Sequence, residues 1–62
     1  MTNQSYTANN VTVEFPMGYD SVHSYYEVLK LNLIQMQSNP KRYAKMIEKY
    51  EASIELCEKA GL

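Results

Sequence analysis

The chain has 62 residues, and its single cysteine and single histidine exclude an internal disulfide and a Cys/His zinc cluster. Its formal net charge of −1 offers no overall attraction to nucleic acid or to an anionic lipid surface. Because a domain of about 60 residues buries only about 60% of the surface that its unfolded chain exposes, we expect added stability from self-association, a bound partner or close helix packing.

The first segment, residues 1–9, is polar and uncharged, and it predicts a flexible arm ahead of one small domain over residues 10–62. This start has neither the basic flank nor the apolar core of a secretory signal. No apolar run approaches the roughly 18 residues that a membrane span needs. We therefore expect a cytoplasmic protein that does not interact with membranes.

The segment NVTVEF, residues 10–15, alternates between apolar and polar side chains. Val11, Val13 and Phe15 share one face, and the β-branched valines and Thr12 favour a pleated surface. One short strand is therefore predicted. The sequence PMGYD that follows indicates a turn.

Two segments with helical spacing follow this turn. Apolar residues recur at intervals of 4, 3, 4 and 3 in each segment: Val22, Tyr26, Leu29, Leu33 and Met36 in residues 21–37, and Tyr43, Ile47, Tyr50, Ile54 and Cys57 in residues 40–60. The sequence SNP separates them, with Ser38 or Asn39 as the expected cap of the second helix and Pro40 in its first turn.

Folding the chain back at this connection pairs the two apolar stripes and predicts an antiparallel helical hairpin. The expected fold class is therefore α+β, mostly α: one short N-terminal strand followed by two helices, completed by self-association. An alternative remains, because LKLNL alternates like a strand and would make residues 22–36 a second strand.

The first predicted helix is apolar on two faces. Val28, Leu31 and Ile34 fall nearly opposite the stripe that pairs with the second helix. Either the strand folds over these three residues, or another polypeptide covers them. A lone strand has open edges, so the same second copy of the chain could both complete the sheet and cover this face. The predicted oligomer or partner interface consists of Val11, Val13, Phe15, Val28, Leu31 and Ile34.

Cations gather at the expected start of the second helix, where the helix dipole disfavours them. Free N–H groups and nearby cations form a possible anion-binding site, and its candidate residues are Ser38, Lys41, Arg42 and Lys45. A solvated charged face is the simpler interpretation.

No pattern in the sequence indicates catalysis. There is no glycine-rich phosphate loop, no pair of catalytic carboxylates and no serine/histidine/acid set. His23 with Asp20 and Glu27 is a weak metal constellation, and Cys57 lies on an apolar stripe as a core residue does. We expect neither an enzyme nor a cofactor or metal site.

The first functional hypothesis is a small regulatory or inhibitor protein, a homodimer or higher homo-oligomer that acts by binding a macromolecular partner, with a protein partner favoured over DNA. The second is DNA binding, because the order strand, helix, turn, helix resembles the ribbon-helix-helix repressors. This resemblance implies base readers at Asn10, Thr12 and Glu14 and phosphate contacts at Ser38, Lys41 and Arg42. The ribbon face has no cation, however, and Glu14 would point at DNA. The third hypothesis is capture of a phosphate-bearing small ligand at the N-terminus of the second helix.

Overall fold

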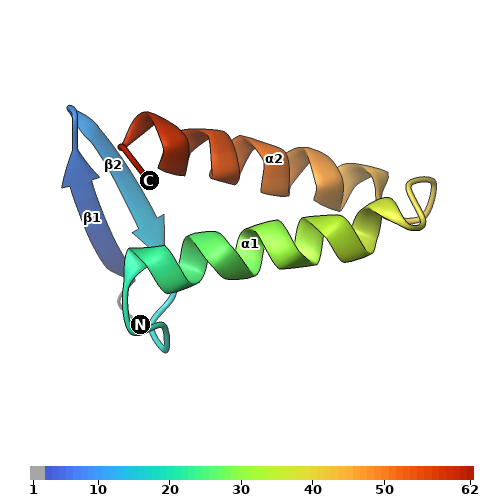
Figure 1. The fold of residues 1–62 in the computed structure, drawn as a ribbon, viewed down its shortest axis with the longest axis horizontal. Coiled ribbons are helices and arrows are strands. Elements are labelled where there is room, and N and C mark those ends of the chain that lie inside the picture. The colour runs from blue at the N-terminus through green and yellow to red at the C-terminus, as the bar shows by residue number, and fades with distance from the viewer. Residues whose placement is uncertain (1–2) are drawn as a thin grey trace.

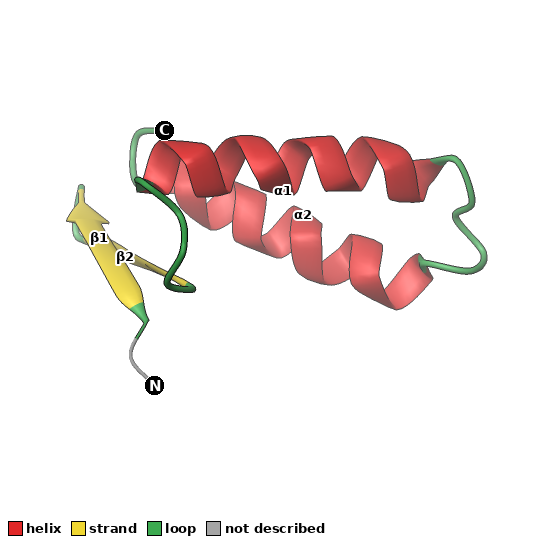
Figure 2. Ribbon diagram, turned by 90° about the horizontal axis from the view of Figure 1, so that it is seen from below, coloured by secondary structure: helices red, strands yellow, loops and turns green. Residues whose placement is uncertain are grey.

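The computed structural model describes residues 3–62 and contains a two-stranded hairpin followed by two antiparallel helices (Figure 1). The elements are β1 (Gln4–Ala8), β2 (Val11–Phe15), α1 (Val22–Gln37) and α2 (Ala44–Lys59). The helices run side by side along the long axis, and the hairpin lies across one end of the pair (Figures 1 and 2). The predicted class, α+β and mostly α, is confirmed.

The β-hairpin corrects the prediction of a flexible arm over residues 1–9. Residues 4–8 form β1, which pairs antiparallel with β2 from Ala8 opposite Val11 to Gln4 opposite Phe15. Residues 1–2 of the predicted arm lie outside the described residues. The turn is made by Asn9 and Asn10 with φ of 54° and 62°, a left-handed conformation that asparagine tolerates better than most residues and that matches the strand twist.

The helix α1 begins one residue later than predicted, and the strand alternative for residues 22–36 is wrong. Ser21 caps the helix by accepting a hydrogen bond from the Ser24 backbone N–H. At the other end the Ser38 hydroxyl donates to the Gln35 carbonyl, at 2.7 Å. Ser38 therefore completes the end of α1 instead of capping α2.

The helix α2 begins at Ala44, not at residue 40, because residues 40–43 form a turn between the helices. Tyr43 stands at its N-cap without a side-chain hydrogen bond. The helix ends at Lys59, and Gly61, with φ of 94°, lets the backbone N–H of Leu62 reach the Cys57 carbonyl.

The core lies where the hairpin meets the helices. The buried residues that form this core are Val13, Phe15, Val22, Leu29, Cys57 and Ala60. The Phe15 ring stacks on Tyr25 with centroids 5.5 Å apart, and Tyr19 meets Tyr25 edge-on at 5.4 Å. The hairpin therefore contributes its inner face to the same core as both helices.

Within residues 3–62, neither helix combines the length and the apolar character that crossing a membrane requires.

Candidate partner-binding surface

The outward face of α1 exposes two large apolar side chains. Leu31 is 60% exposed and Ile34 is 65% exposed, whereas Leu29 and Met36 of the same helix are buried. The hairpin lies across the end of the helices, so it does not cover this face (Figures 1 and 2). The alternative in which the strand folds over Leu31 and Ile34 is therefore wrong, and Val28 is half-buried between the two faces.

Leu31 and Ile34 line a shallow depression together with Glu27 and Lys30, and we name these four residues the α1 surface. Positions 27, 30, 31 and 34 are three or four residues apart, so they are neighbours on consecutive helical turns. The depression is therefore lined by two apolar side chains, one acid and one base.

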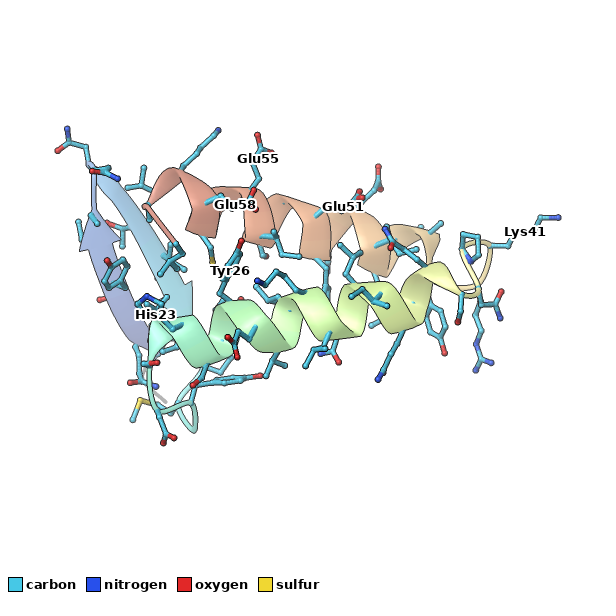
Figure 3. The ribbon with its side chains drawn as sticks, viewed as in Figure 1. His23, Tyr26, Lys41, Glu51, Glu55 and Glu58 are labelled. Atoms are coloured by element: carbon cyan, nitrogen blue, oxygen red, sulfur yellow. The ribbon has the colours of Figure 1, made fainter. Side chains whose placement is uncertain are left out.

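The Lys30 side chain contacts an aromatic ring. Its Nζ lies over the Tyr26 ring, 4.2 Å from the centroid, a cation–π contact. The Tyr26 hydroxyl in turn donates to Glu58 Oε2 of α2 at 2.9 Å, and Figure 3 shows these two side chains pointing toward each other across the helices. The pKa of the Tyr26 phenol is raised, mainly by this hydrogen bond to Glu58 and to a smaller extent by partial burial. The α1 surface therefore lies beside a polar link between the two helices.

The strand residues of the predicted interface lie in the core and not beside Leu31 and Ile34. Val13 and Phe15 are only 2% and 4% exposed, because they belong to the chain's own core, and Val11 is half-buried against that core. They are not on the surface of the single chain. The six predicted residues are thus divided, and Leu31 and Ile34 are the two that remain exposed.

The candidate anion-binding residues lie at the opposite end of the molecule from the hairpin. Lys41 and Arg42 are in the turn before α2, and Lys45 is in its first turn; Figure 3 shows Lys41 at this far end. Arg42 lies over the Tyr43 ring at 5.5 Å, and within residues 3–62 none of the three cations is within ion-pair distance of an acid. They form an exposed basic patch, from which Ser38 is turned away toward Gln35.

This placement separates the two residue sets of the ribbon-helix-helix hypothesis. Asn10 lies in the hairpin turn, and Thr12 and Glu14 are on the exposed face of β2. The molecule is 33 Å long, and the basic patch is at the other end of it. The ribbon also differs, because its two strands come from one chain. Within one chain, the predicted base readers therefore lie at the other end of the molecule from Lys41 and Arg42.

A second depression lies between the helices near their connection, and no sequence signal beyond helical periodicity predicts it. Its lining residues are Asn32, Gln35, Met36, Tyr43, Met46 and Tyr50. Amide and phenol groups surround two methionines there, and no charged group is among them.

The titratable side chains of the described residues are mostly at the surface. Residues 3–62 contain no cluster of three metal-ligating side chains and no buried charged side chain. Cys57 is fully buried, and this burial raises the pKa of its thiol.

No family model, no curated protein and no solved structure matches this chain. The functional proposal therefore rests on the geometry of the surface.

Proposed function

We propose that this is a small non-enzymatic protein that binds a protein partner through the α1 surface and acts as a regulator or inhibitor by occupying that partner. The observation that carries the proposal is the exposure of Leu31 and Ile34, at 60% and 65%, on a helix whose opposite face is already buried against α2. Exposed apolar side chains that cluster on one face are typical of binding sites.

The shape of this surface favours one mode of recognition. Two apolar anchors three residues apart on a helix fit a hydrophobic groove of a partner, as amphipathic helices do when they bind in grooves. Glu27 and Lys30 line the same depression, and charged groups at an interface govern orientation and specificity more than affinity. We therefore expect a partner with an apolar groove that carries charges of both signs at its edge.

The distribution of titratable groups supports a binding role over catalysis. Catalytic sites hold such groups in clefts where burial and neighbours shift their pKa. Here the groups whose pKa is raised are Tyr25, Tyr26 and Cys57, two phenols and a thiol, and none of them lines either depression. The two depressions described above are lined by neither paired carboxylates nor a histidine.

A photo-crosslinking experiment in the native host tests the proposal. A benzophenone amino acid at position 31 should crosslink one protein reproducibly, because this position lies at the centre of the α1 surface. The matched control carries the same label at Glu48, an exposed position on α2. Ile34→Asp should abolish the crosslink, since a carboxylate in an apolar groove is poorly solvated.

A second variant separates the α1 surface from the basic patch. Lys41→Glu with Arg42→Glu should leave the crosslink at position 31 unchanged, because these residues are in the turn between the helices and do not line the α1 surface. Equal labelling from positions 31 and 48, or loss of the crosslink only in the charge-reversed variant, would refute the proposal.

A further inference from the structure

The outer edge of β1 is open. The strand that packs against both helices is β2, and β1 lies on the far side of it (Figures 1 and 2). Among residues 3–62, no backbone hydrogen bond from outside the hairpin reaches β1. Its outward N–H and C=O groups are therefore available to another strand.

The register identifies which groups these are. A two-residue turn closes on a hydrogen-bonded pair, here Ala8 with Val11, and such pairs alternate with non-bonded pairs along an antiparallel ladder. Gln4, Tyr6 and Ala8 are then bonded to β2, and the backbone groups of Ser5 and Thr7 point outward. The contact of 3.0 Å between the hydroxyls of Thr7 and Thr12 agrees with this register, in which they form a non-bonded pair, because side chains approach closely in such pairs.

The edge of β1 also lacks the features that usually block pairing. Charged residues and prolines protect the edge strands of natural sheets, and the β1 sequence, QSYTA, has neither. The other strand differs, because β2 carries the exposed acid Glu14 and is followed directly by Pro16. Only β1 presents an uncharged edge that can pair with itself.

We propose that two copies of the chain associate through β1, edge to edge and antiparallel, to form one four-stranded sheet. The twofold axis passes beside Tyr6, so Ser5 of each copy pairs with Thr7 of the other. These are the residues whose backbone groups point outward, and an antiparallel pair of identical strands satisfies them reciprocally. The interface is distinct from the α1 surface, and the inference does not rest on the proposed function.

A further observation supports this partner. Tyr6 is half-buried on the inner face, packed against the core, and the twofold axis places the two Tyr6 side chains next to each other. Adjacent aromatic residues on one face of a sheet stabilise strand pairing.

Sedimentation of the purified protein tests the association. The wild type should be a dimer at micromolar concentration. Thr7→Pro removes an outward N–H that β2 does not use, and proline is accepted at such edge positions. It should weaken the dimer by roughly 10- to 100-fold, because the twofold axis doubles the loss of one hydrogen bond. Thr7→Ala keeps the N–H and is the matched control that should leave the dimer intact.

Disulfide trapping tests the register. Tyr6→Cys should form a crosslinked dimer under mild oxidation, because the two Cβ atoms of this pair are close across the axis. Thr12→Cys, an exposed position on β2, should stay uncrosslinked, and the wild type should as well, since Cys57 is buried. Circular dichroism of each variant establishes that the fold is retained.

Three results would overturn the proposal. The first is a monomeric wild type, and the second is a dimer that Thr7→Pro and Thr7→Ala leave equally stable. The third is a dimer that dissociates in Leu31→Asp with Ile34→Asp but not in Thr7→Pro, which would assign self-association to the α1 surface. Should Tyr6→Cys fail to fold, the comparison of Thr7→Pro with Thr7→Ala still decides between the outcomes.

Discussion

The two ends of the helical pair are covered differently. At one end the β-hairpin closes over the helices, and Val13, Phe15, Val22, Cys57 and Ala60 are buried together. At the other end the helices are joined by an exposed turn. Met36 is buried there, beside a depression that remains open between α1 and α2. In this chain, burial is therefore greatest where the β-hairpin adds a third element to the two helices.

The largest expected effect is at the closed end. Phe15→Ala removes a side chain that is 4% exposed and stacked on Tyr25, and it should lower the free energy of unfolding by about 3–5 kcal/mol. Since small domains have total stabilities near the lower end of about 5–15 kcal/mol, much of the variant should be unfolded. Chemical denaturation followed by circular dichroism measures this change.

The matched variant at the open end is Met36→Ala. Its cost should be near the lower limit for such truncations, about 2 kcal/mol, because water already has access beside it. Equal costs for Phe15→Ala and Met36→Ala would mean that the two ends contribute alike, and the contrast between them would be lost.

A smaller effect is expected at Gly61, where the end of α2 meets the tip of the hairpin. Gly61 has φ of 94°, and a Cβ there would lie 3.2 Å from Asn9 Nδ2. Gly61→Ala should therefore cost about 1–2 kcal/mol, mostly from the left-handed backbone. Thermal unfolding measures the change.

Gly18 is the control for this glycine, because its φ is 110° and nothing lies within 4 Å of an added Cβ. Gly18→Ala should show the backbone cost alone. If Gly18→Ala were the more destabilising of the two, the contact between Gly61 and Asn9 would have no role in joining the hairpin to α2.

The smallest effect concerns the link between the helices at Tyr26. The hydrogen bond to Glu58 raises the pKa of Tyr26 in the folded protein, so folding favours the protonated phenol. The stabilisation is complete below the ordinary tyrosine pKa of about 10 and is lost as the pH rises through the raised value. The melting temperature should therefore fall at alkaline pH, and Tyr26→Phe should reduce that fall.

Tyr25 provides the comparison for this titration. Burial raises the pKa of Tyr25 as well, so part of the alkaline loss should persist in Tyr26→Phe. An unchanged alkaline profile in that variant would show that the bond between Tyr26 and Glu58 does not contribute to stability.

The sequence predicts the helices well and the strands only in part. Apolar spacing of 4 and 3 determines which sides of α1 and α2 meet, and this is a local property of the chain. The strand β1 was missed because QSYTA has one aromatic residue and no β-branched aliphatic residue, and its Asn-Asn turn is a weaker signal than Asn-Gly. The start of α2 was placed too early, because Ser38 can serve either helix and binds the Gln35 carbonyl of α1.

The candidate site was likewise predictable where it depends on local spacing and not where it depends on how the strands pack. Helical periodicity was enough to place Leu31 and Ile34 on an uncovered face, and both are exposed. It could not show that Val13 and Phe15 would be buried within the chain, because that depends on where the strand packs. Nor could it reveal the open edge of β1, which exists only once β1 is known to pair with β2.

The composition of the core has a consequence for the order of folding. Contacts between the helices beside their connection join residues that are near in sequence, whereas Val13 and Ala60 share a core from distant parts of the chain. Bringing these distant segments together costs the most chain entropy, and contacts of this kind form slowly. We therefore expect the helices to associate early and the β-hairpin to dock late. Before the β-hairpin docks, β1 and β2 expose their apolar face and their strand edges to solvent. At this stage of folding the chain is most vulnerable to aggregation and proteolysis.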